Sequence, residues 1–156
     1  MKALLDTNVI VDTLQRREPM FATSSKVIIA IAANQLQGYV TSKEIADIHY
    51  FSRKQFAGQE KTDKKARKVI EGLLLFLDII DTTGEDCKKA LTIENNDYED
   101  AIMINSAVRS NIDCIITRNP KHFKLSPIPI YSPEEILKLL ESEDNGSIRN
   151  TGEQNG

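Results

Sequence analysis

Acidic side chains stand at the points of this 156-residue sequence where a short apolar run has just ended or a helix is about to begin. Asp6 directly follows the first run, Glu44 lies three residues after the second, and Asp97 and Asp100 open a later helical segment. If these acids meet, they must share a proton or a cation, because two unit charges about 4 Å apart repel by about 4 kcal/mol at an effective dielectric constant of about 20. The pattern therefore indicates carboxylates gathered around a divalent cation.

Oxygen ligands without cysteine or histidine favour Mg²⁺ or Mn²⁺ over zinc. Thr7 and Asn8 can add further oxygens beside Asp6. A cation held in this way lowers the pKa of a bound water and clamps a phosphodiester for in-line attack. The chemistry indicated is metal-assisted hydrolysis of a phosphoester.

Each acid also has a structural interpretation. Asp97 and Asp100 can cap an ordinary helix, and Glu44 can be a first-turn acid that complements the helix dipole. Asp6 ends a buried strand, so it needs either hydrogen bonds or a cation. These alternatives stay open for each residue alone, and the metal interpretation depends on the set.

The elements that must position these acids alternate along the chain. Short apolar segments predict strands at 2–5, 39–41, 79–81, 114–117 and 128–131, whereas helical patterns cover 23–36, 42–56 (with Ser42 as N-cap), 63–77, 98–110 and 133–140. Residues 132–135 (SPEE) form a capping box for the last helix. Strands separated by helices predict a parallel sheet, and we expect an α/β fold: a single three-layer α/β/α domain with a short-stranded parallel sheet. The carboxyl ends of its strands would meet at one edge.

The formal net charge of −3 lies entirely in the last 16 residues, so residues 1–140 sum to zero. Binding of nucleic acid through overall charge alone is therefore excluded. No apolar run approaches the ~20 residues of a membrane span, and none precedes Asp6. We therefore expect a cytoplasmic protein without a signal peptide or a membrane partner. Residues 142–156, with one large apolar side chain, should form a flexible polar tail.

Four ordered motifs resemble those of the PIN-domain family. They are residues 5–12 (LDTNVIVD), 42–48 (SKEIADI), 97–102 (DYEDAI) and 116–123 (ITRNPKHF), and residues 128–135 (IPIYSPEE) also fit. PIN domains are metal-dependent nucleases, and small bacterial ones are commonly VapC-type toxins of toxin–antitoxin pairs. The resemblance implies a PIN-like nuclease domain over residues 1–141, acting as an endoribonuclease on RNA.

Carried over by position, Asp6, Glu44 and Asp100 are the implied catalytic acids and, with Asp97 as an auxiliary acid, the implied metal ligands. Asp6 and Asp100 would hold the ion while Glu44 orients a ligand or water.

Asn8, Thr117 and Asn119 are implied auxiliary residues, and Thr117 would contact either the substrate phosphate or the Asp6 carboxylate. Asn119 stands where many relatives carry a fourth acid, and His122 stands nearby where another Asp is frequent. The Asn119 amide can coordinate a cation but adds no charge. We therefore expect one ion in the free enzyme and a second that arrives with RNA.

Basic residues offer candidate contacts to RNA phosphates. Lys64 and Lys65 belong to a cluster at the start of the 63–77 helix, which is either a solvated face or a phosphate-tracking patch. Arg118 and Lys121 could line the edge of the site. No stacking platform of interleaved aromatic residues is visible in the sequence.

Two other functions remain open. A non-catalytic PIN-like binding module with a degraded site is favoured by the absence of a fourth acid at Asn119. A phosphatase with an aspartyl nucleophile would need an acid two residues after Asp6, where the chain has Asn8. The partners implied by the resemblance are an RNA substrate, an antitoxin whose segment covers the cleft, and a second copy of the chain in a homodimer.

Overall fold

The computed structural model of the protein describes residues 1–94 and 97–151. Its centre is a five-stranded sheet in the order β3-β2-β1-β4-β5, with every neighbouring pair parallel. The strands are β1 (Lys2–Leu5), β2 (Gln37–Thr41), β3 (Leu77–Ile80), β4 (Cys114–Ile116) and β5 (Ile130–Tyr131). Each overlaps one of the predicted strand segments, so the α/β fold is confirmed.

The order of the strands reverses at β1, because β2 and β3 lie on one side of it and β4 and β5 on the other. A crevice forms at such a switch point, outside the carboxyl ends of the two strands that flank it. Asp6 follows β1 and Thr117 follows β4. The topology alone therefore brings these two residues to the same crevice.

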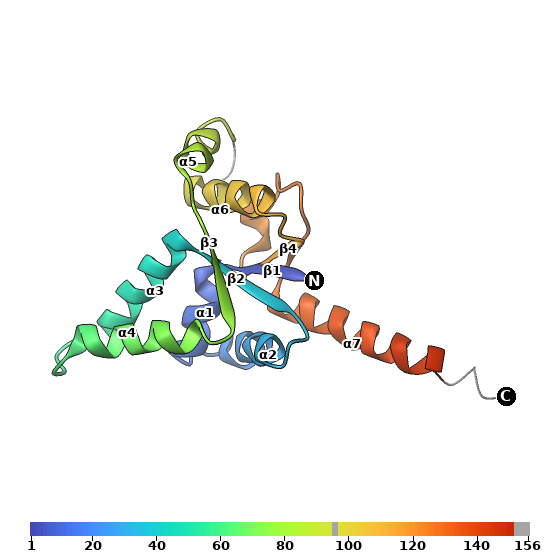
Figure 1. The fold of residues 1–156 in the computed structure, drawn as a ribbon, viewed down its shortest axis with the longest axis horizontal. Helices are drawn as coiled ribbons and strands as arrows, with labels where there is room; N and C mark the ends of the chain where they lie inside the picture. The colour runs from blue at the N-terminus through green and yellow to red at the C-terminus, as the bar shows by residue number, and fades with distance from the viewer. Residues whose placement is uncertain (95–96, 152–156) are drawn as a thin grey trace.

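Helices cover both faces of the sheet (Figure 1). On one face lie α1 (Thr7–Leu14), α2 (Phe21–Ala32) and α7 (Pro133–Thr151); on the other lie α6 (Tyr98–Arg109) and the 3₁₀ helix η1 (Pro120–Phe123). The helices α3 (Ser42–Gln55) and α4 (Thr62–Leu73) pack against each other as an arm at one side, and α5 (Gly84–Ala90) packs on α6. Within the described residues, no helix is both long and apolar enough to cross a bilayer.

The central strand shows why its sequence is apolar throughout. Ala3 and Leu5 pack into the core on the α1, α2 and α7 side, whereas Leu4 packs on the α6 side. Side chains alternate between the two faces of a strand, so a strand covered on both faces must be apolar at every position. All three side chains are fully buried.

Gly38 on β2 allows α2 to approach the sheet closely. A Cβ at this position would lie 2.6 Å from Cδ2 of Leu77 and 2.7 Å from Cγ2 of Ile31. Both atoms belong to buried core side chains. The absence of a side chain at Gly38 thus sets the distance between α2 and β2.

Several predicted boundaries were wrong. The helix predicted over 63–77 ends at Leu73, because Leu77 belongs to β3 and only happens to continue the helical spacing. The N-cap of α3 is Thr41 and not Ser42. The short helices α1 and α5 were not predicted, since their few apolar residues do not span two full turns of helical pattern.

The last helix runs to Thr151 and does not end at Leu140. Its predicted capping box is present, because the Glu135 amide donates to Ser132 Oγ (3.2 Å) and the Ser132 amide donates to Glu135 Oε2 (2.7 Å). The tail was predicted only from the lack of apolar residues in 142–156. A helix can continue through such a segment on its own backbone hydrogen bonds, without burying apolar surface. Residues 152–156 lie outside the described residues, and the flexibility of the tail stays a prediction.

Candidate active site

Asp6 is held by its neighbours at the switch point. It caps α1, where its Oδ1 accepts a long hydrogen bond from the Asn8 amide (3.4 Å). Its Oδ2 accepts from the Asn8 side chain at 2.6 Å and from Thr117 Oγ1 at 2.7 Å. Burial is the largest effect on the Asp6 carboxyl and raises its pKa, although these hydrogen bonds oppose the rise. Oδ1 is therefore the less occupied oxygen and the better placed to take a further ligand.

Asn8 and Thr117 link the ends of β1 and β4, because the Asn8 side chain donates to Thr117 Oγ1 at 3.4 Å. Asn8 Oδ1 accepts from the Arg118 amide at 3.1 Å, and Thr117 Oγ1 accepts from the Asn119 amide at 3.0 Å. Of the two contacts implied for Thr117, the structure shows the one with the Asp6 carboxylate. The hydrogen bonds of Asn8 and Thr117 therefore fix the orientation of Asp6.

Glu44 is buried and satisfied by four donors. Its Oε1 accepts from the amide (3.0 Å) and hydroxyl (3.4 Å) of Thr7, and its Oε2 accepts from the amide (2.8 Å) and hydroxyl (3.0 Å) of Thr41. The Thr41 contacts complete a capping box, so Glu44 joins the first turns of α1 and α3. Burial and then the charge of Asp6 raise the pKa of Glu44 to about 8.

Asp100 reaches the same cavity from α6. Asp6, Glu44 and Asp100 together line a cavity of about 280 Å³. Burial and then the charges of Asp6 and Asp97 raise the pKa of Asp100 to about 6, and His122 opposes that rise. The Nδ1 of His122 lies 3.5 Å from Asp100 Oδ2. The structure thus brings three of the four predicted acids to one cavity.

Asp97 does not line this cavity. It is the N-cap of α6, and its Oδ1 accepts from the Glu99 amide at 2.9 Å. This hydrogen bond is the helix-capping contact that the structural interpretation of Asp97 predicted. Its influence on the site is electrostatic, because its charge raises the pKa of Asp100.

The acids offer the oxygen ligands that hard divalent cations such as Mg²⁺ prefer. Within residues 1–94 and 97–151, no group of three or more His, Cys, Asp or Glu side chains is arranged so that it could hold a metal ion. Each Glu44 oxygen already accepts two protein hydrogen bonds, whereas Asp6 Oδ1 accepts one long hydrogen bond, so Asp6 Oδ1 and Asp100 are better placed as ligands. Mg²⁺ is commonly bound by only one or two carboxylates together with waters and substrate phosphates. Metal binding by these residues stays a prediction.

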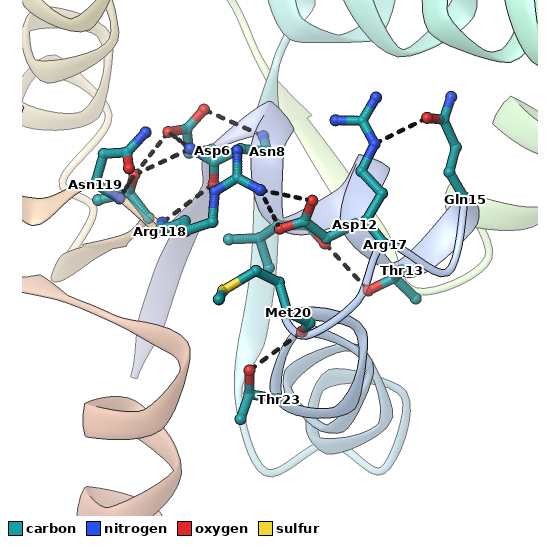
Figure 2. A network of polar contacts seen from close by, with 12 residues as sticks. Asp6, Asn8, Asp12, Thr13, Gln15, Arg17, Met20, Thr23, Arg118 and Asn119 are labelled. Carbon is teal, nitrogen blue, oxygen red and sulfur yellow. Dashed lines mark hydrogen bonds and ion pairs between the residues drawn. The ribbon is translucent and has the colours of Figure 1, made fainter.

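Arg118 is engaged inside the protein. Its Nη1 donates to both carboxylate oxygens of Asp12, at 2.9 and 3.0 Å (Figure 2). Asp12 is fully buried, and about a third of the Arg118 side chain remains exposed. Sequence reasoning missed Asp12, although Asn8 and Asp12 stand four apart on α1 and thus share the face that meets Arg118.

The other basic candidates do not join the acids. Lys64 and Lys65 lie on α4, in the arm of Figure 1, and neither lines the acidic cavity. Lys121 is exposed on η1. The basic residue that does line the cavity is Lys43, which sequence reasoning missed and which pairs with Asp47 (2.7 Å) and Glu99 (3.1 Å).

Fold and site together define an α/β protein with an acidic cavity at the switch point of a parallel sheet. A model of the family described as PIN domain matches residues 2–121, and the chain therefore belongs to the PIN-domain family. The resemblance seen in the sequence is thereby confirmed. In the comparison with curated proteins, none matches this chain.

Three solved structures illustrate the shared fold. A toxin–antitoxin complex from Klebsiella pneumoniae matches with 19% identity and a TM-score of 0.62, over 84% of this chain and 97% of that one. VapBC2 from Rickettsia felis, bound to a DNA fragment from its promoter, matches with 22% identity and a TM-score of 0.58 (85% and 98%). FitAcB from Neisseria gonorrhoeae matches with 15% identity and a TM-score of 0.64 (84% and 97%).

Proposed function

We propose that the chain is a Mg²⁺- or Mn²⁺-dependent endoribonuclease that acts as the toxin of a toxin–antitoxin pair. The observation that carries this proposal is the cavity lined by Asp6, Glu44 and Asp100, whose pKa values are all raised. Buried carboxyls that repel one another are stabilised in their charged forms by a cation. Membership of the PIN-domain family supports the nuclease assignment.

In this proposal the two available carboxylates, those of Asp6 and Asp100, hold the ion. The hydrogen bonds from Asn8 and Thr117 keep Asp6 in one orientation before the ion arrives. When bound, the ion supplies positive charge to a phosphodiester and lowers the pKa of a water molecule. The protein's own contribution is to place the acids at one point of a partly enclosed cavity.

Glu44 acts as a positioning residue. Its hydrogen bonds to Thr7 and Thr41 hold the starts of α1 and α3 together, and Asp6 is the N-cap of α1. With a pKa of about 8, Glu44 carries a proton in the metal-free protein at neutral pH, and in that form one of the two threonine hydroxyls accepts a hydrogen bond from Glu44 and does not donate one to it. We expect it to release this proton when a cation binds beside Asp6, so metal binding should release protons to the buffer.

Asn119 sets the expected number of ions. Its amide donates to Thr117, which places it at the edge of the site, but its side chain carries no charge. We therefore propose one ion in the free protein and a second that arrives with RNA. A calorimetric titration with Mn²⁺ should show one binding event, and two tight sites would contradict this proposal.

We further propose an antitoxin partner, a homodimer and a cytoplasmic location. The support for an antitoxin is the likeness of fold to chains solved as a toxin–antitoxin complex and as VapBC2. A small antitoxin-like reading frame beside the gene would supply the partner to test. Co-expression of that partner should suppress cleavage and any growth defect.

The decisive experiment compares matched Asp→Asn substitutions. Asp6→Asn and Asp100→Asn should each lower Mn²⁺-dependent RNA cleavage by at least about 100-fold, because each removes one of two charged ligands. Asp78→Asn makes the same chemical change at an exposed position of β3 and should leave cleavage unchanged. Circular dichroism checks that the variants fold. Full cleavage by folded Asp6→Asn protein would refute the proposal.

A non-catalytic binding module is the second candidate. It is favoured by the lack of a ready-made ligand group in the described residues and by the neutral Asn119. That candidate predicts no Mn²⁺ binding at millimolar concentration and no cleavage by the wild type. A phosphatase with Asp6 as nucleophile is disfavoured by Asn8, whose amide binds Asp6 where a second acid is needed; a trapped aspartyl-phosphate would support it.

A further inference from the structure

Two adjacent aromatic residues on α3 line the acidic cavity. Tyr50 and Phe51 lie beside Asp6, Glu44 and Asp100 in its lining. Their ring centroids are 5.7 Å apart, with an angle of 71° between the rings. Tyr50 is 55% exposed. The Tyr50 ring is therefore accessible to a ligand that enters the cavity.

Tyr50 also lines a second pocket, of about 450 Å³, whose charged lining residues are Arg53 and Lys54. Lys54 Nζ lies 4.5 Å from the centroid of the Tyr50 ring. Within the part of the chain that the structure describes, neither cation has an ion pair with a carboxylate. Tyr50 thus stands between an acidic cavity and a basic pocket.

The helical spacing of α3 produces this arrangement. Lys43, Asp47, Tyr50 and Lys54 follow one another at intervals of four, three and four residues, so they share one face of the helix. The charge of Lys43 at the cavity is offset by Asp47 and Glu99. The cations available to a bound polyanion therefore lie beyond Tyr50 and not inside the cavity.

We propose that Tyr50, braced by Phe51, is a stacking site for one base of a single-stranded RNA, and that Arg53 and Lys54 bind the phosphates next to that base. This inference rests on the proposed function, because it assumes that the phosphodiester to be cleaved lies at Asp6 and Asp100. The strand would then leave the cavity along α3, towards the last turn of that helix, where Arg53 and Lys54 lie.

The chemistry favours single-stranded RNA over other ligands. Every base has a π-face that can stack on an aromatic ring, and neighbouring cations bind the backbone that joins successive bases. The sequence alone does not show this site, because a pair of aromatic residues on a helix is usually part of the core. The exposed fraction of Tyr50 and its position between the two pockets indicate the ligand.

The first test is a double-mutant cycle in which Tyr50 is changed in the protein and one base is removed from the RNA. The affinity of each protein for each RNA is measured by fluorescence anisotropy. Tyr50→Ala should weaken binding of a short single-stranded RNA by about 10-fold or more, whereas Tyr50→Phe keeps the ring and should bind normally. The wild-type protein should bind an RNA that lacks the base at the stacked position more weakly by the same factor. Tyr50→Ala should then lose nothing further on this abasic RNA, a result that a general folding defect would not give.

The second test separates the two groups of basic residues. Replacing Arg53 and Lys54 together with Ala should reduce the slope of log affinity against log salt by about 1.4, since single strands contribute about 0.7 per phosphate contact. Replacing Lys64 and Lys65 together with Ala is the matched control and should leave the slope unchanged. A reduced slope in the control and not in the Arg53/Lys54 pair would overturn the proposed path.

The outcomes distinguish this inference from the proposed function. If the wild type neither binds nor cleaves RNA, the proposed function fails and this inference fails with it. If the wild type cleaves RNA and Tyr50→Ala binds it with unchanged affinity, only the inference is overturned. The inference is likewise overturned if Tyr50→Ala affects binding of a protein partner alone, which would assign the aromatic pair to a protein interface. Leu75→Ala, which truncates an exposed apolar residue outside both pockets, should match the wild type throughout.

Discussion

The two sides of the acidic cavity are built differently. On the side of β1, every carboxylate oxygen of Asp6 and Glu44 accepts a hydrogen bond from the protein. On the side of α6, Asp100 is half-buried, and within the described residues its side chain has one ion-pair contact, with His122 at 3.5 Å. The first side is fixed before a ligand arrives, whereas the second has room to adjust to one.

This difference follows from the elements that carry the acids. A residue that directly follows a central strand is surrounded by the ends of neighbouring strands, so hydrogen-bond partners are close on several sides. Glu44 and Asp100 both lie in the first turn of a helix, but Glu44 contacts Thr7 at the start of α1 as well as its own N-cap Thr41, whereas Asp100 faces the cavity. Substitutions on the β1 side should therefore affect stability and activity more than substitutions on the α6 side.

The largest effect on stability should come from Arg118→Ala. It leaves the fully buried Asp12 carboxylate without its partner, and breaking a buried ion pair in this way costs about 3 kcal/mol or more in the free energy of unfolding. Asp12→Ala should cost less, because the partly exposed Arg118 can be hydrated. Urea denaturation measures both values.

The exposed pair of Arg67 and Asp63 provides the control for that comparison. Arg67→Ala removes an arginine from an ion pair of similar length and should leave the urea midpoint almost unchanged, since exposed pairs contribute little. Equal losses of stability in Arg118→Ala and Arg67→Ala would show that the ion pair on the β1 side stabilises the protein no more than an exposed pair does.

The Asp12–Arg118 pair also shows where sequence reasoning stopped. The strands and the common edge of the acids could be predicted, because apolar runs of four or five residues separated by helical patterns have few other arrangements. Asp12 could not be identified in this way, since a polar residue inside a short helix looks the same whether it faces solvent or a distant arginine. Asp97 shows the converse: its position in the sequence fits a helix cap as well as it fits a metal ligand, and in the structure it is the N-cap of α6. Whether a polar residue such as Asp12 faces solvent or a buried partner depends on residues far away in the chain, and Arg118 lies 106 positions from Asp12.

The second prediction concerns pH and metal together. The pKa values of Glu44 (about 8) and Asp100 (about 6) lie above their ordinary values of 4.5 and 3.8. The folded state therefore binds more protons than the unfolded state between about pH 4 and pH 8, and the stability of the metal-free protein should fall as the pH rises through this range. We expect the free energy of unfolding to fall steadily between pH 5 and pH 8.5, measured by urea denaturation in EDTA.

Mn²⁺ should reverse this trend, because it favours the charged carboxylates and its binding strengthens as the pH rises. Asp100→Asn removes one of the three carboxyls whose pKa is raised and should flatten the metal-free profile in part. Stability that rises with pH in EDTA would show that the acids are not buried together as the structure has them.

The third prediction tests the hydrogen bond that orients Asp6. Thr117→Val keeps the shape of a fully buried side chain but removes the hydroxyl that donates to Asp6. We expect Mn²⁺ affinity to fall about 10-fold, which corresponds to about 1.4 kcal/mol and is typical of one hydrogen bond to a charged group. Thr23→Val removes a hydroxyl on α2 that donates to a backbone carbonyl away from the acids, and it should leave Mn²⁺ affinity unchanged.

The smallest effect should come from His122→Ala, on the α6 side. The His122 side chain is 59% exposed, and its contact with Asp100 is 3.5 Å long, so water can replace it at little cost. We expect Mn²⁺ affinity to change less than about 3-fold. His49→Ala breaks a comparable contact with Asp63 on the arm and should leave Mn²⁺ affinity unchanged. If His122→Ala weakened Mn²⁺ binding as much as Thr117→Val does, the α6 side would be as firmly organised as the β1 side. Asp100 would then be a residue that His122 orients before the ion binds, and not one that the ion draws into place.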